Sequence, residues 1–452
     1  MLQVVLRTGD PKNVKACKTK LEKSGNFDGR NGIQKDGSEF LIHTNMYIES
    51  HEKFEESLTK EELHTLGCKI ALVSVPTVTA SSFLEELDAR GSSLANAVAS
   101  TLRALLPSRN EIYDLDYVRS LVSSIPQRYY VYKPLLLVAT GEFLSVPEWT
   151  NIFEDANFQA AFFSHLAERL RVTHIAVNAP IQGAMSNEMR KPTGLVCLHG
   201  AFGHEITTRT INAPQLSDFS SELWATTRQN GIFQTWAPRY TMFSRGNIKE
   251  KTRVLSFPHV SGKTIVDLYA GIGYFTFSYM AAGAKLVLCW EINPWSIEGL
   301  IRGARGNKWT VKLVRHDEEW VPDDNAAQAI VLFWESNVYA SERIRKATAE
   351  AMLEFDLSHI NLGFLPSSEN SWPVAIDLVH MSCTSNVMLH IHENIADTAM
   401  EEFSKDTTSS LSDSSSRSEK QYHVSCQHIE KIKTYAPGVV HVCGDFEVST
   451  IM

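Results

Sequence analysis

The chain has 452 residues, of which 43% are hydrophobic and 21% charged, and its formal net charge is −9. These values are ordinary for a soluble globular protein, and the length allows two or three domains with sizeable cores. The sequence lacks the run of about 18 apolar residues that a membrane span needs, and no cleavable signal pattern follows the N-terminus. None of the seven cysteines stands in a CxxC pair, which argues against a zinc ribbon or disulfide framework and favours a cytoplasmic location.

The first 107 residues mix short apolar runs, such as 69–78, with a helical pattern at 81–107, and they predict an α+β region. The middle region, 108–257, is rich in aromatics and Pro, with a helix predicted at 158–172. From residue 258 onwards, short apolar runs alternate with helical periods, which is typical of a parallel sheet. We therefore predict an α/β protein in three parts, 1–107, 108–257 and a Rossmann-like domain at 258–452.

Basic residues cluster in two segments although the net charge is negative. Residues 1–35 contain eight Lys or Arg against three acidic residues. Residues 236–253 contain Glu250 as their one acidic residue, and their basic residues are Arg239, Arg245, Lys249, Lys251 and Arg253. Electrostatic attraction acts over a Debye length of about 8–10 Å. The local charge therefore matters more for phosphate binding than the net charge of the whole chain. Either segment alone fits a solvated surface, and only its neighbours decide whether it contacts phosphate.

Within the last region, the alternation of patterns predicts each element. Strands are predicted at 264–269, 285–291, 310–315, 359–365 and 387–393, and helices at 276–283, 295–307 and 341–355. Residues 428–448 fit a terminal antiparallel hairpin around a Tyr-Ala-Pro-Gly turn. Residues 326–355 fit an insertion before the fourth strand. Eight of the fifteen residues 404–418 are Ser, so we predict a disordered insertion there, because such a stretch buries nothing.

The strongest motif is the run Asp267-Leu-Tyr-Ala-Gly271-Ile-Gly273, between a predicted strand and a predicted helix. A tight glycine turn lets the backbone approach a ligand closely, and the helix N-terminus behind it adds donors. Glu291 ends the next strand, where a carboxylate accepts hydrogen bonds from the hydroxyls of a ribose. The strand context and the spaced acidic residue favour a nucleoside cofactor over a purely structural turn.

The residues around the glycines distinguish between cofactors. A dinucleotide site requires a third Gly or Ala, whereas Tyr274 and Phe275 follow the second glycine and crowd the pyrophosphate position. Asp267 suits a ligand that carries an ammonium and a sulfonium, so the motif favours S-adenosylmethionine over NAD. The acidic pair Asp317 and Glu318 follows the third strand. This pair would either reach an adenine amino group or stand in a solvated loop, and its spacing in the sequence does not distinguish the two possibilities.

Several stretches share a resemblance to known proteins: MFSRGNIKEKTRV, TIVDLYAGIGYFTF, CWEINPWSIEGLIRGARGN and KIKTYAPGVVHVCGDFEV. They resemble the superfamily of tRNA methyltransferases and wybutosine-synthesizing transferases, from roughly Trp236 to the C-terminus, whereas the N-terminal third matches loosely. NLGFLPSSENSW is similar to the wybutosine-synthesizing members, since the guanosine N1-methyltransferases carry a shorter Asn-Leu-Pro form there. HDEEW departs from the Gly-Asp-Asn-Arg of the superfamily, which puts the role of Glu318 in doubt. The resemblance implies a class I methyltransferase fold with a mostly parallel sheet.

The resemblance also implies site residues. Ser244, Lys251 and Glu291 stand where the family contacts its cofactor, with Lys251 pairing with the cofactor carboxylate and Ser244 donating a hydrogen bond nearby. Together with the motif, the predicted cofactor residues are Ser244, Lys251, Asp267, Tyr269, Gly271, Gly273, Glu291, Asp317 and Glu318. The predicted tRNA and substrate residues are Arg239, Arg245, Lys249, Asn361, Pro366 and Ser367.

The activity that the resemblance implies is transfer of the 3-amino-3-carboxypropyl group of S-adenosylmethionine, with release of methylthioadenosine. The acceptor would be carbon 7 of 4-demethylwyosine at position 37 of tRNA(Phe). The middle region of the chain would help to bind this tRNA. Two alternatives stay open: a tRNA guanosine-37 N1-methyltransferase, and a non-catalytic tRNA-binding protein with a cofactor pocket. Other enzymes of the pathway are left open as partners.

No metal is expected from the sequence. His390 and His392 have the i, i+2 spacing of a strand, and no Cys or acidic ligand is expected beside them, so they are interpreted as core or substrate-facing residues. The other histidines and cysteines of the C-terminal segment read as scattered strand residues: His423, Cys426, His428, His441 and Cys443.

Overall fold

The computed structural model describes residues 2–29, 32–48, 68–74, 79–89, 93–108, 114–139, 144–178, 194–322, 329–350, 354–415 and 421–451. The chain divides into two compact units, one of residues 1–92 with 102–123 and one of residues 93–101 with 124–452. Neither predicted boundary, at 107 or at 257, coincides with this division, and the three-part organisation stays a prediction. No helix among the described residues is both long and apolar enough to cross a membrane.

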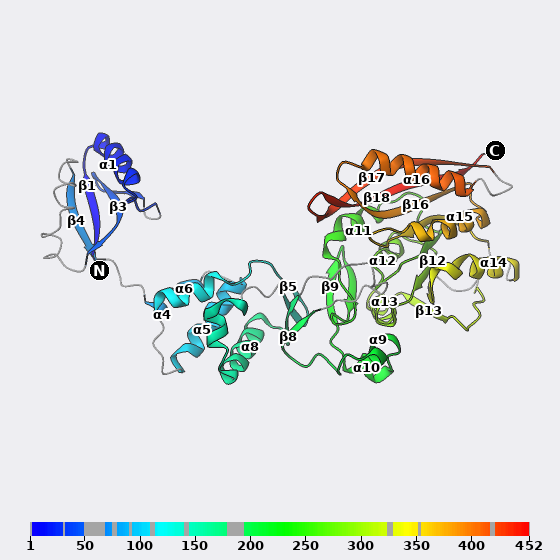
Figure 1. Ribbon diagram of the computed structural model, residues 1–452, viewed down its shortest axis with the longest axis horizontal. Coiled ribbons are helices and arrows are strands. Elements are labelled where there is room, and N and C mark those ends of the chain that lie inside the picture. Colours follow the sequence, from blue (N-terminus) through cyan, green and yellow to red (C-terminus); the bar gives the residue numbers. More distant parts are fainter. Residues whose placement is uncertain are drawn as a thin grey trace. The chain divides into compact units, whose positions relative to one another are not determined.

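The first unit contains a four-stranded antiparallel sheet with one helix packed on it (Figure 1). Its elements are β1 (Leu2–Thr8), α1 (Pro11–Lys23), β2 (Ile33–Asp36), β3 (Glu39–Ile48), β4 (Lys69–Ser74), α4 (Ala80–Ala89), η1 (Leu106–Ser108) and α6 (Leu115–Ser123). The strand order is β2-β3-β1-β4. Helix α1 starts at Pro11 because Asp10 caps it, accepting from the backbone N of Lys12 at 2.9 Å. The division between the units passes through α5 (Leu94–Leu105).

The second unit begins with a small mixed sheet and a two-stranded ribbon. Its first elements are β5 (Tyr129–Tyr132), β6 (Leu135–Ala139), α7 (Pro147–Ile152), α8 (Ala156–Leu170), β7 (His174–Asn178), β8 (Val196–His199), α9 (Thr208–Asn212), α10 (Leu216–Ser221), β9 (Ala225–Gln229) and β10 (Ile232–Trp236). In the sheet β5-β6-β7-β8, only the central pair β6 and β7 runs parallel. Strands β9 and β10 pair with each other as a separate ribbon.

An eight-stranded sheet forms the rest of this unit. Its elements are η4 (Arg245–Asn247), α11 (Ile248–Val254), β11 (Thr264–Asp267), α12 (Thr276–Ala281), β12 (Leu286–Glu291), α13 (Pro294–Gly306), β13 (Thr310–Arg315), β14 (Ala329–Trp334), η5 (Asn337–Tyr339), α14 (Ala340–Glu350), β15 (Leu357–Leu362), η6 (Glu369–Ser371), α15 (Trp372–Met381), β16 (Asn386–Ala396), α16 (Met400–Ser415), β17 (Tyr422–Ala436) and β18 (Val439–Thr450). The order is β13-β14-β12-β11-β15-β16-β18-β17, parallel up to β16 and antiparallel in the final hairpin. The predicted Rossmann-like α/β fold is confirmed.

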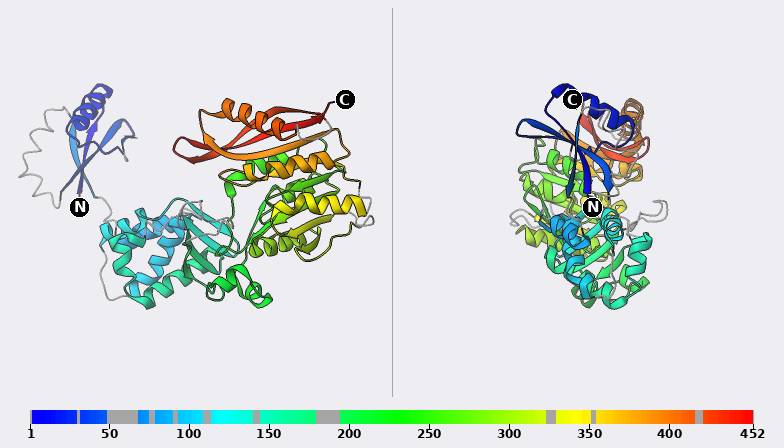
Figure 2. Two further views of the ribbon diagram at one scale, coloured as in Figure 1. Left: turned by 45° about the vertical axis from the view of Figure 1, so that its right-hand side comes forward. Right: turned by 90° about the vertical axis from the view of Figure 1, so that its left-hand side faces the viewer.

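Helices cover both faces of this sheet (Figures 1 and 2). Successive residues of a strand point to opposite faces, so Val266 and Leu288 pack with α14, α15 and α16, whereas Ile265 and Val287 pack with α11, α12 and α13. Because both faces are buried, the inner strands β11 and β12 are nearly continuous apolar runs, which makes them recognisable in the sequence.

Strand β14 corrects the prediction that residues 326–355 are an insertion. It lies between β13 and β12, and its six residues AIVLFW pair with both neighbours. A parallel strand at this place is covered on both faces and therefore needs no polar alternation. Six apolar residues are enough for a strand, but in the sequence they stand next to the charged residues of α14, and the strand was therefore not recognised.

Helix α16 corrects the prediction of a disordered Ser-rich segment at 404–418, of which 416–418 lie outside the described residues. Its buried side chains recur every four residues, at Phe403, Thr407, Leu411 and Ser415, and so form one face. Hydroxyls bond back to the preceding turn, as Ser412 Oγ does to the carbonyl oxygen of Thr408 at 2.7 Å. The composition predicts disorder, but Phe403 and Leu411 are spaced to pack on the sheet. Four hydroxyls donate to backbone carbonyl oxygens of the helix, those of Thr408, Ser412, Ser414 and Ser415.

Candidate functional site

A cavity of about 680 Å³ opens at the carboxyl ends of the central parallel strands. Its wall includes Tyr269 and Gly271 after β11, Glu291 at the end of β12, Asn337 after β14 and Phe364 after β15. Strand order reverses at β11, with β12 on one side and β15 on the other. Ligands of open α/β sheets bind at such a switch point.

The predicted glycine turn forms the floor of this cavity. Gly271 and Gly273 have φ angles of +55° and +87°, which side-chain-bearing residues rarely adopt. A Cβ on Gly271 would stand 2.8 Å from the ring of Tyr274, and one on Gly273 would stand 2.6 Å from the ring of Phe277. Of the two, only Gly271 lines the cavity, so Gly273 serves the packing of the turn against α12.

Glu291 is held by the turn that it faces. Its Oε2 accepts from the backbone N of Gly271 at 2.8 Å, and its Oε1 accepts from the backbone N of Ile292 at 2.9 Å and of Asn293 at 2.7 Å. Burial raises the pKa of Glu291, and these donors oppose that shift. A carboxylate has about four lone-pair sites, so about one remains for a ligand hydroxyl.

Asp267 lies beneath the turn and does not line the cavity. Its oxygens accept from Asn361 Nδ2 at 2.9 Å, from Thr276 Oγ1 at 2.8 Å and from the backbone N of Tyr269 at 3.3 Å. Burial raises the pKa of this carboxyl, against the effect of those donors. Asp267 and Asn361, predicted as ligand contacts, therefore fasten β11 to β15 and position the turn.

The end of the cavity next to β12 and β14 is lined by residues that the sequence did not indicate. Glu335, Asn337 and Val338 line it, whereas Asp317 and Glu318 stand exposed after the edge strand β13. Strand β14 accounts for the difference, because it lies beside β12 and leaves β13 at the edge of the sheet. Glu335 is buried and accepts from Arg343 Nε at 2.9 Å, Arg343 Nη2 at 2.8 Å and His316 Nδ1 at 3.0 Å.

The opposite end is aromatic and basic. Ser244 and Arg245 come from the loop before α11, Lys433 from β17, and Tyr130 and Tyr132 from β5. The Arg245 guanidinium lies 4.6 Å from the ring centre of Tyr130, and Lys433 Nζ donates to Ser244 Oγ at 3.3 Å. Sequence reasoning found Ser244 and Arg245 but missed the other three, because they lie in segments far from the glycine motif.

Lys251 is placed behind the cavity wall rather than in it. Its Nζ donates to Gln229 Oε1 and to Gln234 Oε1, both at 2.9 Å, and lies 4.8 Å from the ring centre of Phe243 and 5.2 Å from that of Tyr274. Burial lowers the pKa of Lys251 to about 7, with a further contribution from the charge of Lys433. Lys433 lines the cavity and Lys251 does not, so the pairing of Lys251 with a cofactor carboxylate stays a prediction.

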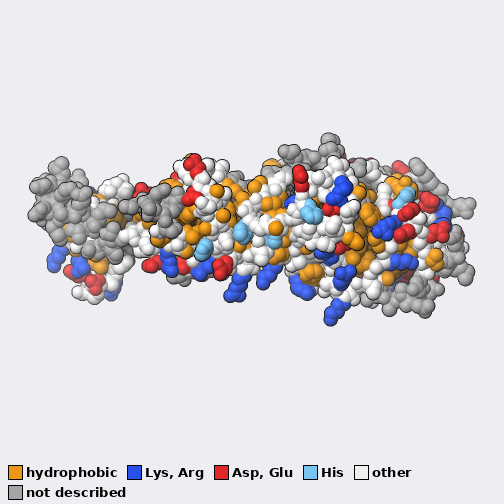
Figure 3. Space-filling view, turned by 90° about the horizontal axis from the view of Figure 1, so that it is seen from below, with side chains coloured by type: hydrophobic (Ala, Val, Ile, Leu, Met, Phe, Trp, Pro, Cys, Tyr) orange, Lys and Arg blue, Asp and Glu red, His pale blue; other side chains and the backbone are white. Residues whose placement is uncertain are grey.

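The other predicted basic contacts are engaged in ion pairs. Arg239 pairs with buried Glu222, and Lys249 pairs with Glu430. Neither lines the cavity, so among the predicted basic tRNA residues the structure brings only Arg245 to it. On the face drawn in Figure 3, the Lys and Arg side chains of the described residues are interspersed with Asp and Glu.

The loop after β15 borders the cavity through different residues from those expected. Phe364 and Leu365 line the cavity, with Phe364 stacked on Tyr269 at 5.0 Å between ring centres, whereas Pro366 and Ser367 are exposed beside it. Ser367 Oγ donates to Glu393 Oε1 at 3.0 Å, and the backbone N of the next residue donates to the same oxygen at 2.8 Å. Burial raises the pKa of Glu393 to about 7. Ser367 therefore ties the loop to β16.

Known proteins resemble this chain in sequence. The family model described as TRM5/TYW2 methyltransferase domain matches residues 226–354. The tRNA wybutosine-synthesizing protein 2 of Schizosaccharomyces pombe is 41% identical over 326 residues, covering 72% of this chain and 73% of that protein. The protein of the same name in Saccharomyces cerevisiae is 31% identical over 489 residues, covering 99% of this chain and 98% of that protein. The solved structure of P. horikoshii TYW2 in complex with MeSAdo aligns with a TM-score of 0.49 at 18% identity, covering 78% of this chain and 99% of that chain. At the identity and coverage of the two yeast relatives, the chain belongs to the tRNA wybutosine-synthesizing protein 2 family.

Proposed function

We propose that this protein transfers the 3-amino-3-carboxypropyl group of S-adenosylmethionine to carbon 7 of 4-demethylwyosine at position 37 of tRNA(Phe), with release of methylthioadenosine. The observation that carries the proposal is one continuous cavity with two chemically different ends. A nucleoside-type end is formed by Gly271 and Glu291, and an aromatic, basic end by Tyr130, Arg245 and Lys433. With tRNA as the acceptor, the cytoplasm is the expected place of action.

The nucleoside-type end suits the adenosine part of the donor. Glu291 has a lone pair left for a ribose hydroxyl, and the backbone behind Gly271 comes close to the ligand without a side chain. Ile292 and Val338 line the same end and are 38% and 59% exposed, respectively. Two exposed apolar side chains on a cavity wall offer a slot for a flat purine ring.

The basic end suits the carboxylate of the donor and the acceptor base. Lys433 and Arg245 supply cations, and Ser244 supplies a hydroxyl, close to the glycine turn. Tyr130 and Tyr132 stack on each other at 5.7 Å between ring centres and present aromatic surface to the same space. A flipped tricyclic base gains stacking energy on such a surface.

The choice of the migrating carbon follows from alignment. A sulfonium activates all three attached carbons, and displacement requires the nucleophile, the attacked carbon and the sulfur in line, with reacting atoms about 3–3.5 Å apart. If Lys433 and Arg245 hold the carboxylate of the amino-acid arm, they turn that arm towards the acceptor. The methyl group then points away from the nucleophile and leaves on sulfur.

The test uses two forms of the donor, one labelled on the methyl carbon and one on the carboxyl carbon. With tRNA(Phe) that carries 4-demethylwyosine, we expect the carboxyl label in tRNA and the methyl label in methylthioadenosine. A parallel reaction with tRNA(Phe) that carries unmodified guanosine-37 serves as the control and should give no product. Methyl label in the tRNA that carries guanosine-37 would instead establish an N1-methyltransferase, and methyl label in the 4-demethylwyosine tRNA would refute transfer of the aminocarboxypropyl group. Binding without transfer of either label would establish a non-catalytic tRNA-binding protein.

A further inference from the structure

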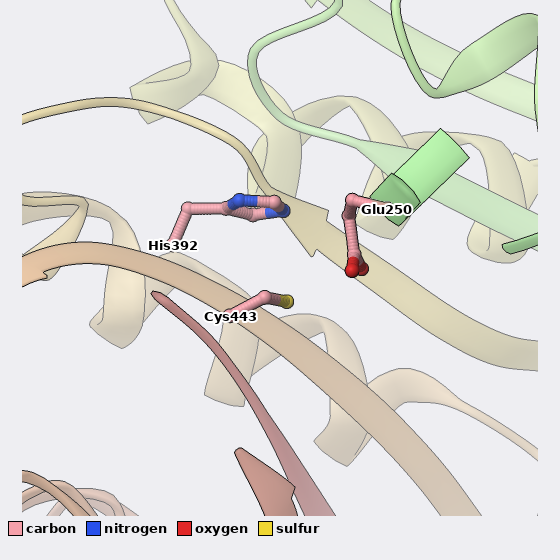
Figure 4. Close-up of side chains that lie close together, drawn as sticks. All are labelled: Glu250, His392 and Cys443. Carbon is pink, nitrogen blue, oxygen red and sulfur yellow. The ribbon is translucent and has the colours of Figure 1, made fainter. Parts of the chain in front are cut away.

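A buried cluster of potential metal ligands lies outside the cavity. Glu250 on α11, His392 on β16 and Cys443 on β18 each offer one ligand atom, and these three atoms lie within 4.8 Å of one another. Their exposed fractions are 1%, 1% and 0%. Figure 4 shows the imidazole, the carboxylate and the thiol converging on one point from three separate elements.

His392 has a nitrogen that no group among the described residues satisfies. Its Nδ1 lies 3.0 Å from His441 Nε2, whereas its Nε2 is buried and has no hydrogen-bond partner in the described part of the chain. Leaving a polar atom buried without a partner costs about 1–3 kcal/mol, so such an atom requires an explanation. In Figure 4 the outer nitrogen of this ring points towards the space between Glu250 and Cys443.

We propose that Glu250, His392 and Cys443 bind a divalent transition-metal ion, with zinc as the best match to this ligand set. Zinc is bound in proteins by carboxylate oxygen, imidazole nitrogen and thiolate sulfur, and three protein ligands leave a fourth, tetrahedral position for water. Binding replaces the S–H bond of Cys443 by a metal–sulfur bond and releases the proton to solvent. No electron is transferred in this step.

The surrounding charges favour a divalent cation. Arg253 donates to Glu250 Oε1 at 2.7 Å and to Asp445 Oδ1 at 3.0 Å, and His390 Nδ1 contacts the same Asp445 oxygen at 2.7 Å. Glu250, Asp445 and a Cys443 thiolate carry three negative charges against the one positive charge of Arg253. With the histidines neutral, a divalent ion leaves the buried cluster neutral, and His441 and Arg253 contact two of the ligands from the side away from the ion.

The expectation that His392 lacks nearby Cys or acidic ligands is wrong. In the antiparallel pairing of β16 with β18, His392 stands directly opposite Cys443. Helix α11 then brings Glu250 over the same pair. Since α11 follows the residues Ser244–Asn247, which line the cavity, an ion would fasten that edge of the cavity to the C-terminal hairpin.

The test is cobalt substitution in the full-length protein. After treatment with a chelator, the chain is titrated with Co²⁺ alone and its absorption spectrum is recorded. We expect one equivalent to give the intense visible bands of a tetrahedral site and a sulfur-to-cobalt charge-transfer band, both displaced by Zn²⁺. Thermal melting should move to higher temperature with added Zn²⁺.

Cys443→Ser should abolish the charge-transfer band, whereas Cys426→Ser, a matched change on the neighbouring strand β17, should leave it intact. Circular dichroism shows whether each variant is folded. If Cys443→Ser does not fold, the wild-type titration and Cys426→Ser still decide the matter. A folded wild-type chain that shows no charge-transfer band with excess Co²⁺, or a band that disappears in Cys426→Ser, overturns the proposal. Both outcomes leave the transferase function untouched, because this site does not line the cavity.

Discussion

Replacing Glu291 by Gln tests the nucleoside-type end of the cavity most directly. The carboxylate accepts three backbone N–H groups and has about one lone pair for a ribose hydroxyl. A Gln oxygen can keep the contacts to Ile292 and Asn293, but the amide NH₂ would then face the N–H of Gly271 and the ligand hydroxyl. Loss of one hydrogen bond to a charged acceptor costs about 1.5–3 kcal/mol. At ~1.4 kcal/mol per tenfold, the Kd for S-adenosylmethionine should rise by about 10- to 150-fold.

Isothermal titration calorimetry measures this change, and the melting temperature separates it from loss of fold. Glu318→Gln is the matched control, because Glu318 was predicted to bind the cofactor but stands exposed outside the cavity. We expect its Kd to equal that of the wild type. An unchanged Kd in folded Glu291→Gln would refute the reasoning, and a comparable loss in Glu318→Gln would restore the acidic pair after β13 to the site.

Three further predictions concern packing, pH and tRNA. Leu411→Ala should lower the free energy of unfolding by about 2–4 kcal/mol, because the side chain of Leu411 on α16 is fully buried. Urea denaturation measures this change, and an unchanged midpoint would show that α16 does not pack on the sheet. Burial raises the pKa of Glu393 from 4.5 to about 7, so its contribution to stability is complete below about pH 4.5 and is lost as pH rises through about 7. Denaturation across that range should show the decline, by up to about 3 kcal/mol, and Glu393→Gln should flatten it; an equal slope in both proteins would contradict the assignment. Arg245→Ala should flatten the log–log dependence of tRNA affinity on salt by up to about one unit. Lys249→Ala is the control, because Lys249 is paired with Glu430 outside the cavity. If the salt dependence of tRNA affinity has the same slope in the two variants, Arg245 makes no phosphate contact.

The sequence alone determined the local part of the fold and of the site. The succession from β11 through the glycine turn and α12 to the end of β12 was predictable, because one βαβ unit has its own hydrophobic periods and its own turn. Strand β13 was predicted with the bounds that the structure shows, Thr310–Arg315. Tyr269, Gly271 and Glu291 therefore reach the cavity as expected, since each stands immediately after or at the end of one of these strands.

The tertiary structure decided everything that depends on which segments become neighbours. The apolar run of β14 carried no sign that it would separate β13 from β12 and so replace Asp317 by Glu335 at the cavity. The basic residues looked alike in the sequence, yet Arg239 is neutralised by Glu222, whereas Arg245 faces the cavity. A charge pattern records side chains but not their partners, and those partners come from distant segments.

The same reason applies to the buried histidines. The spacing of His390 and His392 indicated a strand and nothing more, because their partners are set by the register of a later hairpin and by the docking of an earlier helix. Strand pairing placed Cys443 opposite His392, and the packing of α11 on the sheet added Glu250. Sheet register and helix docking depend on the burial of whole faces, which no single stretch of sequence contains.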